Sequence, residues 1–265
     1  MKILGIDVGG TNIDIVLFKD KSFQKISTYS TRDHFSKLNE LIKNLILNYN
    51  ADAVGLSIAV WIKDGKFIHA PNLPEIPAIP NKICGKPVIP ENDANCFALY
   101  ASFIFGFRNI IGITVGTGIG SGIIIDGKIY RGSGIAGEIG HWTIKINNTE
   151  NKCVCGGINH LECYFGGWSL SKLGNVKDLV KTGKIYELGE FYIFCMAVAN
   201  AIMLLDPEAV IFGGRIGANL KKEKLEAGIK KYLMKGFNPR IEILKDELAS
   251  AKGACLMALN KLEKS

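Results

Sequence analysis

A strand–turn–strand pattern occurs twice in this chain of 265 residues. The first copy is "KILGIDVGGTNIDIVLF", and the second is "NIIGITVGTGIGSGIIIDGKIY". In each copy a branched apolar run enters a Gly/Thr turn and an alternating β-branched run leaves it, which predicts a β-hairpin. The second hairpin closes at Asp126-Gly127, a dipeptide typical of tight turns. Such a duplication predicts two related half-molecules, each presenting one Gly/Thr turn.

The two turns are candidates for binding phosphate groups. Gly9 and Gly10 can adopt positive φ and direct backbone N–H groups at an anion. A Walker-type loop is excluded, because no helix with its Lys and Ser or Thr follows these glycines. Two turns facing one another across a cleft would hold a polyphosphate from both sides, and an ordinary hairpin turn is the alternative.

Helical and extended segments follow each hairpin. After the first, "TRDHFSKLNELIKNLILNYN" has a helical apolar period and "AVGLSIAV" reads as the next strand. The Pro-rich stretch "APNLPEIPAIPNKICGKPVIP" predicts a surface loop. "ENDANCFALYASFIFG" begins with helix-capping residues and continues as a helix.

The second half repeats the alternation of helix and strand. "YELGEFYIFCMAVANAIMLL" predicts a long buried helix that Asp206-Pro207 ends before the strand "EAVIFGG". The final "ELASAKGACLMALNKLEKS" predicts a helix of small residues that packs closely on a neighbour. We therefore expect an α/β protein of two domains, residues 1–107 with a C-terminal helix 248–265, and residues 108–247.

Composition and charge indicate a globular protein and favour a small-molecule substrate over nucleic acid. With 48% hydrophobic and 22% charged residues, the chain reads as globular. Its net charge of +7 is densest at "LKKEKLEAGIKKYLMKG", whose pattern favours the solvated face of an amphipathic helix over a nucleic-acid patch. A mild positive balance also suits an anionic substrate such as a nucleotide.

Cysteine usage predicts a reducing compartment. Four of the seven cysteines lie singly in apolar contexts, as reduced core cysteines do: Cys84, Cys96, Cys195 and Cys255. No uncharged apolar run is long enough to span a bilayer, so we expect a cytoplasmic protein without membrane or nucleic-acid partners. The other three cysteines crowd into one loop.

Six motifs resemble those of ROK-family sugar kinases and occur in the same order: "DVGGT", "ENDAN", "VGTGIGSG", "GIAGEIGH", "CVCGGINHLE" and "IFGG". The resemblance runs from Asp7 to Gly214. It implies the two-domain actin-like ATPase fold, which is ribonuclease H-like, with a zinc loop in the second domain. It also implies ATP-dependent phosphorylation of a glucose-like hexose or an N-acylated hexosamine, and a homodimer or higher homo-oligomer.

Phosphoryl transfer needs orientation, charge neutralisation and a proton acceptor. Asp7, at the end of the first strand, is the candidate ligand of Mg²⁺, directly or through water. An Asp that only organises the turn is the alternative. The expected contacts to the nucleotide are Gly9, Gly10, Thr11, Gly116, Thr117 and Gly118 at the phosphates, and Gly213 and Gly214 on the adenosine side.

Asp93 is the candidate catalytic base, because it matches the Asp of the family's "END" segment. The alternative is that "ENDAN" is an elaborate helix cap. A cap needs one such residue, whereas Glu91, Asn92, Asp93 and Asn95 form a cluster, which favours catalysis.

By the same resemblance, the sugar hydroxyls would bind Asn72, Asn92, Asp93, Glu138, His141 and Glu162. Carboxylates and amides together satisfy the donors and acceptors of a hexose. Many relatives carry a Pro-Gly turn after the third strand, whereas this chain has "GLSIAVWIKDG", so we expect Trp61 to reshape the sugar pocket.

The crowded cysteines predict a structural zinc site. Cys153, Cys155 and His160 lie on a glycine-containing loop, and His141 supplies a fourth ligand for a tetrahedron. Similar family members have a third cysteine where His160 stands, so this chain replaces one zinc ligand with another. A decayed motif held by turn hydrogen bonds is one alternative, and a site with Cys163 in place of His160 is another.

Two other functions are compatible with the resemblance. ROK proteins include sugar-sensing repressors, but these carry a helix-turn-helix ahead of the kinase-like fold, and here Met1 directly precedes the first strand. A catalytically silent sugar-binding protein is the other alternative. The presence of Asp7, Asp93 and both turns favours a kinase.

Overall fold

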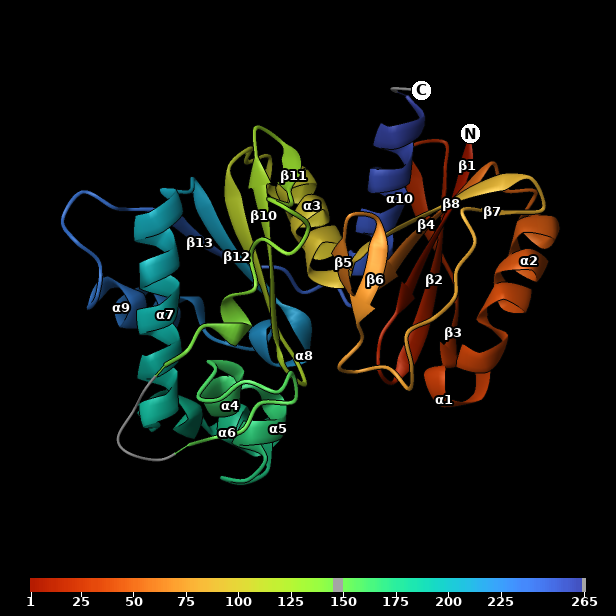
Figure 1. Ribbon diagram of the computed structural model, residues 1–265. Helices are drawn as coiled ribbons and strands as arrows, with labels where there is room; N and C mark the ends of the chain where they lie inside the picture. Colours follow the sequence, from red (N-terminus) through yellow and green to blue (C-terminus); the bar gives the residue numbers. More distant parts are fainter. Residues whose placement is uncertain (145–149, 264–265) are drawn as a thin grey trace. The chain divides into compact units, whose positions relative to one another are not determined.

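The computed structural model describes residues 1–144 and 150–263, in two compact units (Figure 1). Unit 1 comprises Met1–Ile104, Arg131–Ile135 and Leu248–Ser265, and unit 2 comprises Phe105–Tyr130 and Ala136–Glu247. Part of the expected zinc loop, residues 145–149, and the last two residues of the expected C-terminal helix lie outside the described residues. Each unit is built around its own sheet.

Unit 1 contains a six-stranded sheet with the order β3-β2-β1-β4-β8-β7. β1 pairs antiparallel with β2 and parallel with β4, so the first predicted hairpin and the strand after its helix are confirmed. The strands of the unit are β1 (Lys2–Val8), β2 (Asn12–Lys19), β3 (Ser22–Ser30), β4 (Ala53–Ile58), β7 (Lys82–Ile83) and β8 (Lys86–Asn92), with β5 (Trp61–Lys63) and β6 (Lys66–His69) in a separate hairpin.

Helices cover both faces of this sheet. In Figure 1, α2 and α10 lie on opposite sides of it. The helices are α1 (Thr31–His34), η1 (Phe35–Lys37), α2 (Leu38–Tyr49), α3 (Asp93–Phe105) and α10 (Ala249–Leu262). The helix predicted after β3 is confirmed as α2, whereas the first residues of the segment form α1 and η1, because the backbone leaves the helical region at His34 (φ −120°) and Lys37 (φ −112°).

The C-terminal helix packs against the sheet through glycines, as its small residues predict. A Cβ on Gly5 would lie 2.0 Å from the carbonyl oxygen of Ala251, and a Cβ on Gly55 would lie 2.0 Å from that of Ala254. On α10 itself, a Cβ on Gly253 would meet the backbone of Cys96 in α3. Any side chain at these positions would force the helix away from β1 and β4.

Two sequence predictions are wrong in the region between β6 and α3. The prolines of "KPVIP" lie in β8, inside the sheet, and not in a surface loop. β7 pairs only with Lys86 and Pro87, so Pro90 lies beyond the end of β7 on that edge of β8, and Pro87 precedes Val88, where the pairing with β4 begins. Cys84 is exposed, because it forms the β7–β8 turn with positive φ (50°) beside Gly85.

Unit 2 contains a five-stranded sheet with the order β11-β10-β9-β12-β13. β9 pairs antiparallel with β10, which confirms the second hairpin, and Asp126 and Gly127 both have positive φ in the turn that follows. The strands are β9 (Ile110–Val115), β10 (Ile119–Ile125), β11 (Lys128–Tyr130), β12 (Ala209–Gly213) and β13 (Arg240–Ile243).

The predicted long helix of unit 2 is α7 (Gly189–Leu205), which ends at Asp206 with φ 44° before Pro207. The other helical elements are η2 (Ile139–His141), α4 (Glu162–Phe165), α5 (Gly167–Leu170), α6 (Val176–Thr182), η3 (Lys184–Glu187), α8 (Gly214–Gly217) and α9 (Lys222–Lys230). The α9 lysines are mostly exposed, as expected of a solvated face. Across the described residues, no helix combines the length and apolar character needed to cross a membrane.

Candidate functional site

The first Gly/Thr turn joins β1 to β2 in unit 1. Gly9 N–H donates to the carbonyl of Asn12, and the Thr31 hydroxyl donates to the carbonyl of Gly9 (2.7 Å). Neither glycine has positive φ, so that expectation is wrong. Gly10 is needed for a different reason: a Cβ there would lie 2.7 Å from the carbonyl oxygen of Asn72. The close approach brings the loop of Asn72, a candidate sugar ligand, to the turn.

Asp7 lies at the carboxyl end of β1, beside Ser57 of β4. The Ser57 hydroxyl is fully buried and donates to Oδ1 of Asp7 at 2.5 Å. Burial, reinforced by the negative charge of Asp93, raises the pKa of Asp7 to about 7, although the Ser57 hydrogen bond opposes the shift. A carboxylate with so few donors around it is suited to a cation.

Asp93 is the first residue of α3, and Asn92 before it caps the helix. Oδ1 of Asn92 accepts the N–H groups of Ala94 (2.9 Å) and Asn95 (3.2 Å), and its amide nitrogen donates to the carbonyl of Val60 (3.1 Å). Backbone groups therefore occupy both ends of the Asn92 side chain, which leaves less of it for a sugar. The Asp93 carboxylate accepts the N–H of Ala94 (2.9 Å) and its own backbone N–H, and burial raises the pKa of Asp93 although both hydrogen bonds oppose the shift.

The remaining acidic residue of the segment, Glu91, is buried and fully bonded. Its Oε1 accepts the N–H of Asn92 and the amide of Asn95, each at 3.0 Å. Its Oε2 receives Nε (2.7 Å) and Nη2 (2.5 Å) of Arg131. Sequence reasoning missed Arg131, because 40 residues separate the partners and no local pattern links them. The pair fixes the chain that enters α3.

Trp61 begins β5, directly after the carbonyl that Asn92 contacts. Its ring lies 4.8 Å from the ring of His69 in β6, centroid to centroid. This hairpin of unit 1 contains the segment that we expect to differ from the Pro-Gly turn of many relatives. Its effect on a sugar stays a prediction.

In unit 2, the second Gly/Thr turn joins β9 to β10. Gly116 N–H donates to the carbonyl of Gly118 (3.0 Å), and the turn accepts N–H groups from Gly167 and Trp168. The Thr117 hydroxyl accepts Nη2 of Arg215 at 3.3 Å. The turn is thus held by α5 on one side and by α8 on the other.

The paired glycines of "IFGG" lie at the junction of β12 and α8, against β9. Gly214 has φ 79°, and a Cβ on it would lie 2.7 Å from the carbonyl oxygen of Val115. Gly213 and Gly214 therefore lie beside the strand that enters the second turn. In unit 2, the residues predicted for the adenosine side therefore lie near the phosphate residues predicted in the second turn.

Three candidate sugar ligands also converge in unit 2. A Cβ on Gly118 would lie 2.5 Å from Oε2 of Glu162, which places this carboxylate against the turn. Nδ1 of His141 lies 4.0 Å from Oε1 of Glu162, and its Nε2 lies 3.9 Å from Oε2 of Glu138. The segment that carries Glu138 and His141 is positioned by Gly140, which packs on the backbone of Ile119.

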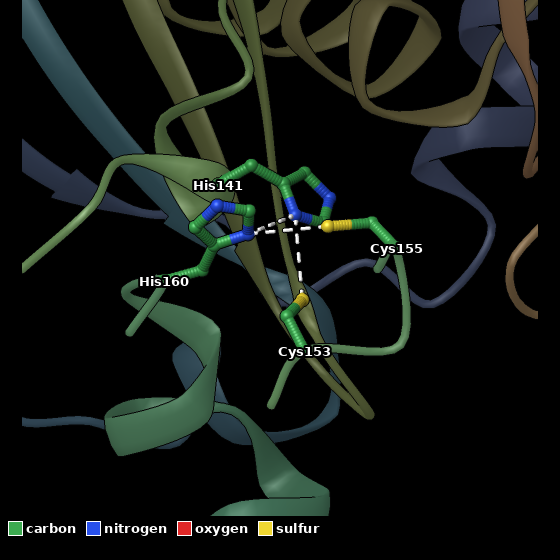
Figure 2. A group of neighbouring side chains, drawn as sticks. All are labelled: His141, Cys153, Cys155 and His160. Carbon is green, nitrogen blue, oxygen red and sulfur yellow. Dashed lines mark hydrogen bonds between the residues drawn. The ribbon is translucent and has the colours of Figure 1, made fainter. Parts of the chain in front are cut away.

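The four predicted zinc ligands form a compact group, shown in Figure 2. The ligand atoms of His141, Cys153, Cys155 and His160 all lie within 4.8 Å of one another. Specifically, Nδ1 of His160 lies 3.2 Å from Sγ of Cys155 and 3.3 Å from Nδ1 of His141, which is 3.7 Å from Sγ of Cys153. Two thiols and two imidazoles at these separations fit a tetrahedral Zn²⁺ site.

Cys163 is not a member of this group, although it is nearby and buried. Cys153 donates instead to Oε1 of Glu162 (2.9 Å), and burial raises the pKa of its thiol well above the usual range. A metal at this position would replace that thiol proton. The same cysteine therefore connects the metal group to a candidate sugar ligand.

Comparisons with known proteins give one consistent result. The ROK family profile matches residues 3–261. N-acetyl-D-glucosamine kinase of Mannheimia succiniciproducens is 25% identical over an alignment of 307 residues, which covers 98% of this chain and 100% of that protein. Glucokinase of Pyrobaculum calidifontis is 30% identical over 242 residues, covering 82% of this chain and 80% of that protein.

The fold is found among solved structures. The crystal structure of ROK hexokinase from Thermus thermophilus matches with a TM-score of 0.81 and 24% identity, covering 100% of both chains. That structure has the actin-like ATPase fold expected from the sequence.

Proposed function

The chain belongs to the ROK family, and from this we propose that it transfers the γ-phosphoryl group of ATP to a hydroxyl of a hexose or an N-acylated hexosamine. Relatives over most of its length are an N-acetyl-D-glucosamine kinase and a glucokinase, which support both sugar classes. They do not favour a sugar-sensing or catalytically silent protein.

The observation that carries the proposal is the division of roles at the start of α3. Asn92 provides the helix cap, so Asp93 is not needed for capping. Its raised pKa makes it a stronger base than an exposed Asp. In the proposed reaction Asp93 accepts the proton of the sugar hydroxyl, the hydroxyl oxygen forms the new bond to phosphorus, and ADP leaves.

The other polar residues would bind the substrates. Asp7 would hold Mg²⁺, which neutralises charge on the phosphates. The proposed nucleotide contacts are Gly9, Gly10, Thr11, Gly116, Thr117, Gly118, Gly213 and Gly214, and the proposed sugar contacts are Asn72, Asn92, Asp93, Glu138, His141 and Glu162. Support comes from the convergence of Glu138, His141 and Glu162 and from the contact of Asn72 with Gly10.

We further propose that His141, Cys153, Cys155 and His160 bind one structural Zn²⁺. The compact arrangement of four soft ligands supports this assignment, and it favours His160 over Cys163 as the fourth ligand. The metal would fix the ends of the loop that carries His141 and Glu162.

Assembly and location are proposals of the same kind. A homodimer or higher homo-oligomer is supported by the family resemblance, and light scattering tests it. A cytoplasmic location is supported by the seven cysteines, all of which are free thiols.

A substrate panel tests the central proposal. The purified protein is incubated with MgATP and each of a set of hexoses and N-acylated hexosamines, and ADP release is coupled to detection of the sugar phosphate by mass spectrometry. We expect phosphorylation of at least one sugar. A protein that binds MgATP and phosphorylates none of them would overturn the proposal.

A further inference from the structure

Thr117, the central residue of the second Gly/Thr turn, is contacted from two sides. Its carbonyl accepts the backbone N–H of Trp168 in α5 (3.1 Å), and its hydroxyl accepts Nη2 of Arg215 in α8 (3.3 Å). Neither Trp168 nor Arg215 belongs to the motifs that point to nucleotide or sugar binding. Both nevertheless meet at a residue with a proposed phosphate-binding role.

The two short helices reach the turn because glycines allow close packing. A Cβ on Gly167 would lie 2.3 Å from the carbonyl oxygen of Gly116 and 3.1 Å from Cδ1 of Ile216. The residues that follow Gly167 and precede Ile216 are Trp168 and Arg215. The backbone N–H of Trp168 and the side chain of Arg215 therefore meet at the same turn.

Arg215 and the neighbouring Trp168 carry N–H groups for which the described residues supply no acceptor. A guanidinium has five N–H groups, and the described contacts of Arg215 use one of them. Nε1 of Trp168 is buried and has no hydrogen-bond partner among the described residues. The ammonium of Lys172 lies 4.5 Å from the centroid of the Trp168 ring. A buried N–H without an acceptor is unfavourable, so an acceptor that reached it would be stabilised.

We propose that Arg215, Lys172 and the indole N–H of Trp168 form a contact site for the phosphate chain of the donor. The inference rests on the proposed kinase function and adds three residues to its donor site. Phosphate oxygens are negatively charged, so they complement the cations of Arg215 and Lys172, and they accept several hydrogen bonds at once. The base of a nucleotide is neutral and therefore fits this cluster less well.

Thr117 connects the cluster to the turn. Because its oxygen accepts a hydrogen bond from a charged donor, its own O–H is left to donate. A donor phosphate is the acceptor that such a hydroxyl needs, and the guanidinium strengthens the hydroxyl as a donor. The carboxylate of Glu162 lies against Gly118 of the same turn and accepts a hydrogen bond from the thiol of Cys153.

Calorimetric titration of the full chain with Mg²⁺-tripolyphosphate, MgATP and adenosine tests the site without any sugar. Arg215→Ala should weaken binding of tripolyphosphate and ATP by roughly ten- to hundred-fold, as for loss of a charge-assisted hydrogen bond. Trp168→Phe keeps the ring and removes the N–H, so it should weaken both several-fold. Lys172→Ala should reduce the salt dependence of binding. Arg240→Ala, an exposed arginine of the same unit, is the matched control and should change nothing.

The outcomes separate this site from the kinase proposal. If the wild-type protein binds tripolyphosphate through Arg215 but phosphorylates no sugar, the donor site stands and the kinase proposal falls. If Arg215→Ala binds tripolyphosphate as the wild-type protein does, or if adenosine loses as much affinity as ATP, the phosphate site is wrong. A wild-type protein that binds neither tripolyphosphate nor ATP would also overturn it.

Discussion

Neighbouring residues with similar side chains have different tasks at the start of α3. Asn92 binds backbone N–H groups at the end of the helix, and Glu91 binds Arg131 and Asn95, whereas the Asp93 carboxylate accepts the N–H groups of Ala94 and of Asp93 itself. The sequence indicated that the cluster exceeds the needs of a cap. Which residue caps the helix depends on backbone geometry, and the structure was needed to assign it.

Asp93→Asn tests the role of the base. The amide keeps the shape of the side chain but cannot accept the hydroxyl proton, so turnover should fall by about 10²- to 10⁴-fold with sugar affinity nearly intact. Turnover is measured by ADP release and affinity by calorimetry, on the sugar that the panel identifies. Asp126→Asn, in the exposed β10–β11 turn, is the control. Near-normal turnover of Asp93→Asn would exclude Asp93 as the base.

Asp7 should make the stability of the metal-free protein depend on pH. Its pKa is raised from 3.8 to about 7, so the folded protein binds this proton more tightly than the unfolded chain does. Stability should therefore decrease as the pH rises from about 4 to 7 and then level off, by at most about 4 kcal/mol from this residue.

Urea unfolding in Mg²⁺-free buffer at pH 5.5 and pH 8.5 measures this effect, at pH values on either side of the raised pKa. Asp7→Asn has no proton to lose, so it should be less sensitive to pH than the wild-type protein and more stable at the higher pH. Asp33→Asn, which removes an exposed carboxylate of the same unit, is the control. An unchanged pH dependence in Asp7→Asn would contradict the assignment.

At the scale of elements, the sequence predicted those that have strong local signals. Both hairpins, α3, α7 and α10 follow from periodicity, capping residues and turn dipeptides. The strand β8 was missed because its tolerance of proline depends on where its pairing with β7 ends and its pairing with β4 begins, which is tertiary information. The position of Arg131 is a further case, because the chain enters unit 1 for only five residues, Arg131–Ile135.

Arg131→Ala should loosen the segment that leads into α3. The substitution leaves the buried carboxylate of Glu91 with fewer hydrogen-bond donors. It should lower the free energy of unfolding by roughly 1.5–3 kcal/mol, as for loss of a charge-assisted hydrogen bond. Because Asp93 follows two residues later, kcat should fall more than the KM for sugar rises.

A double-mutant cycle distinguishes this effect from general destabilisation. Glu91→Gln removes the buried charge, so Arg131→Ala should be less harmful in that background, both in urea unfolding and in kcat. If the effects of the two substitutions were additive, loss of the Glu91–Arg131 ion pair would not be the cause of the effect of Arg131→Ala.

At the scale of the whole molecule, each unit has its own core. The core of unit 1 includes Ile6, Leu56 and Ile42, and the core of unit 2 includes Ile113, Phe194 and Phe212. The sequence predicted the duplication that gives rise to them, because the repeated hairpin is a local pattern. It also predicted the four residues of the metal group, since three of them are close in sequence. The sequence did not predict the contacts of Arg215 and Trp168 with the second turn, because these residues are distant from the turn along the chain.

Loss of zinc should therefore destabilise unit 2 and leave unit 1 unchanged. We expect about one zinc per chain by elemental analysis of protein purified without a metal-binding tag. His160→Ala should lose the zinc, because the remaining two thiols and one imidazole cannot complete the tetrahedron, whereas His160→Cys should retain it as a matched control.

Hydrogen exchange tests where the loss of zinc acts. His160→Ala should lose protection in η2 and α4, which carry His141 and Glu162, while β1, β4 and α10 keep theirs. Sugar affinity should fall with the zinc, and His160→Cys should retain both. Wild-type protein without zinc or another transition metal would exclude the site, and equal loss of protection in both units would contradict its confinement to unit 2.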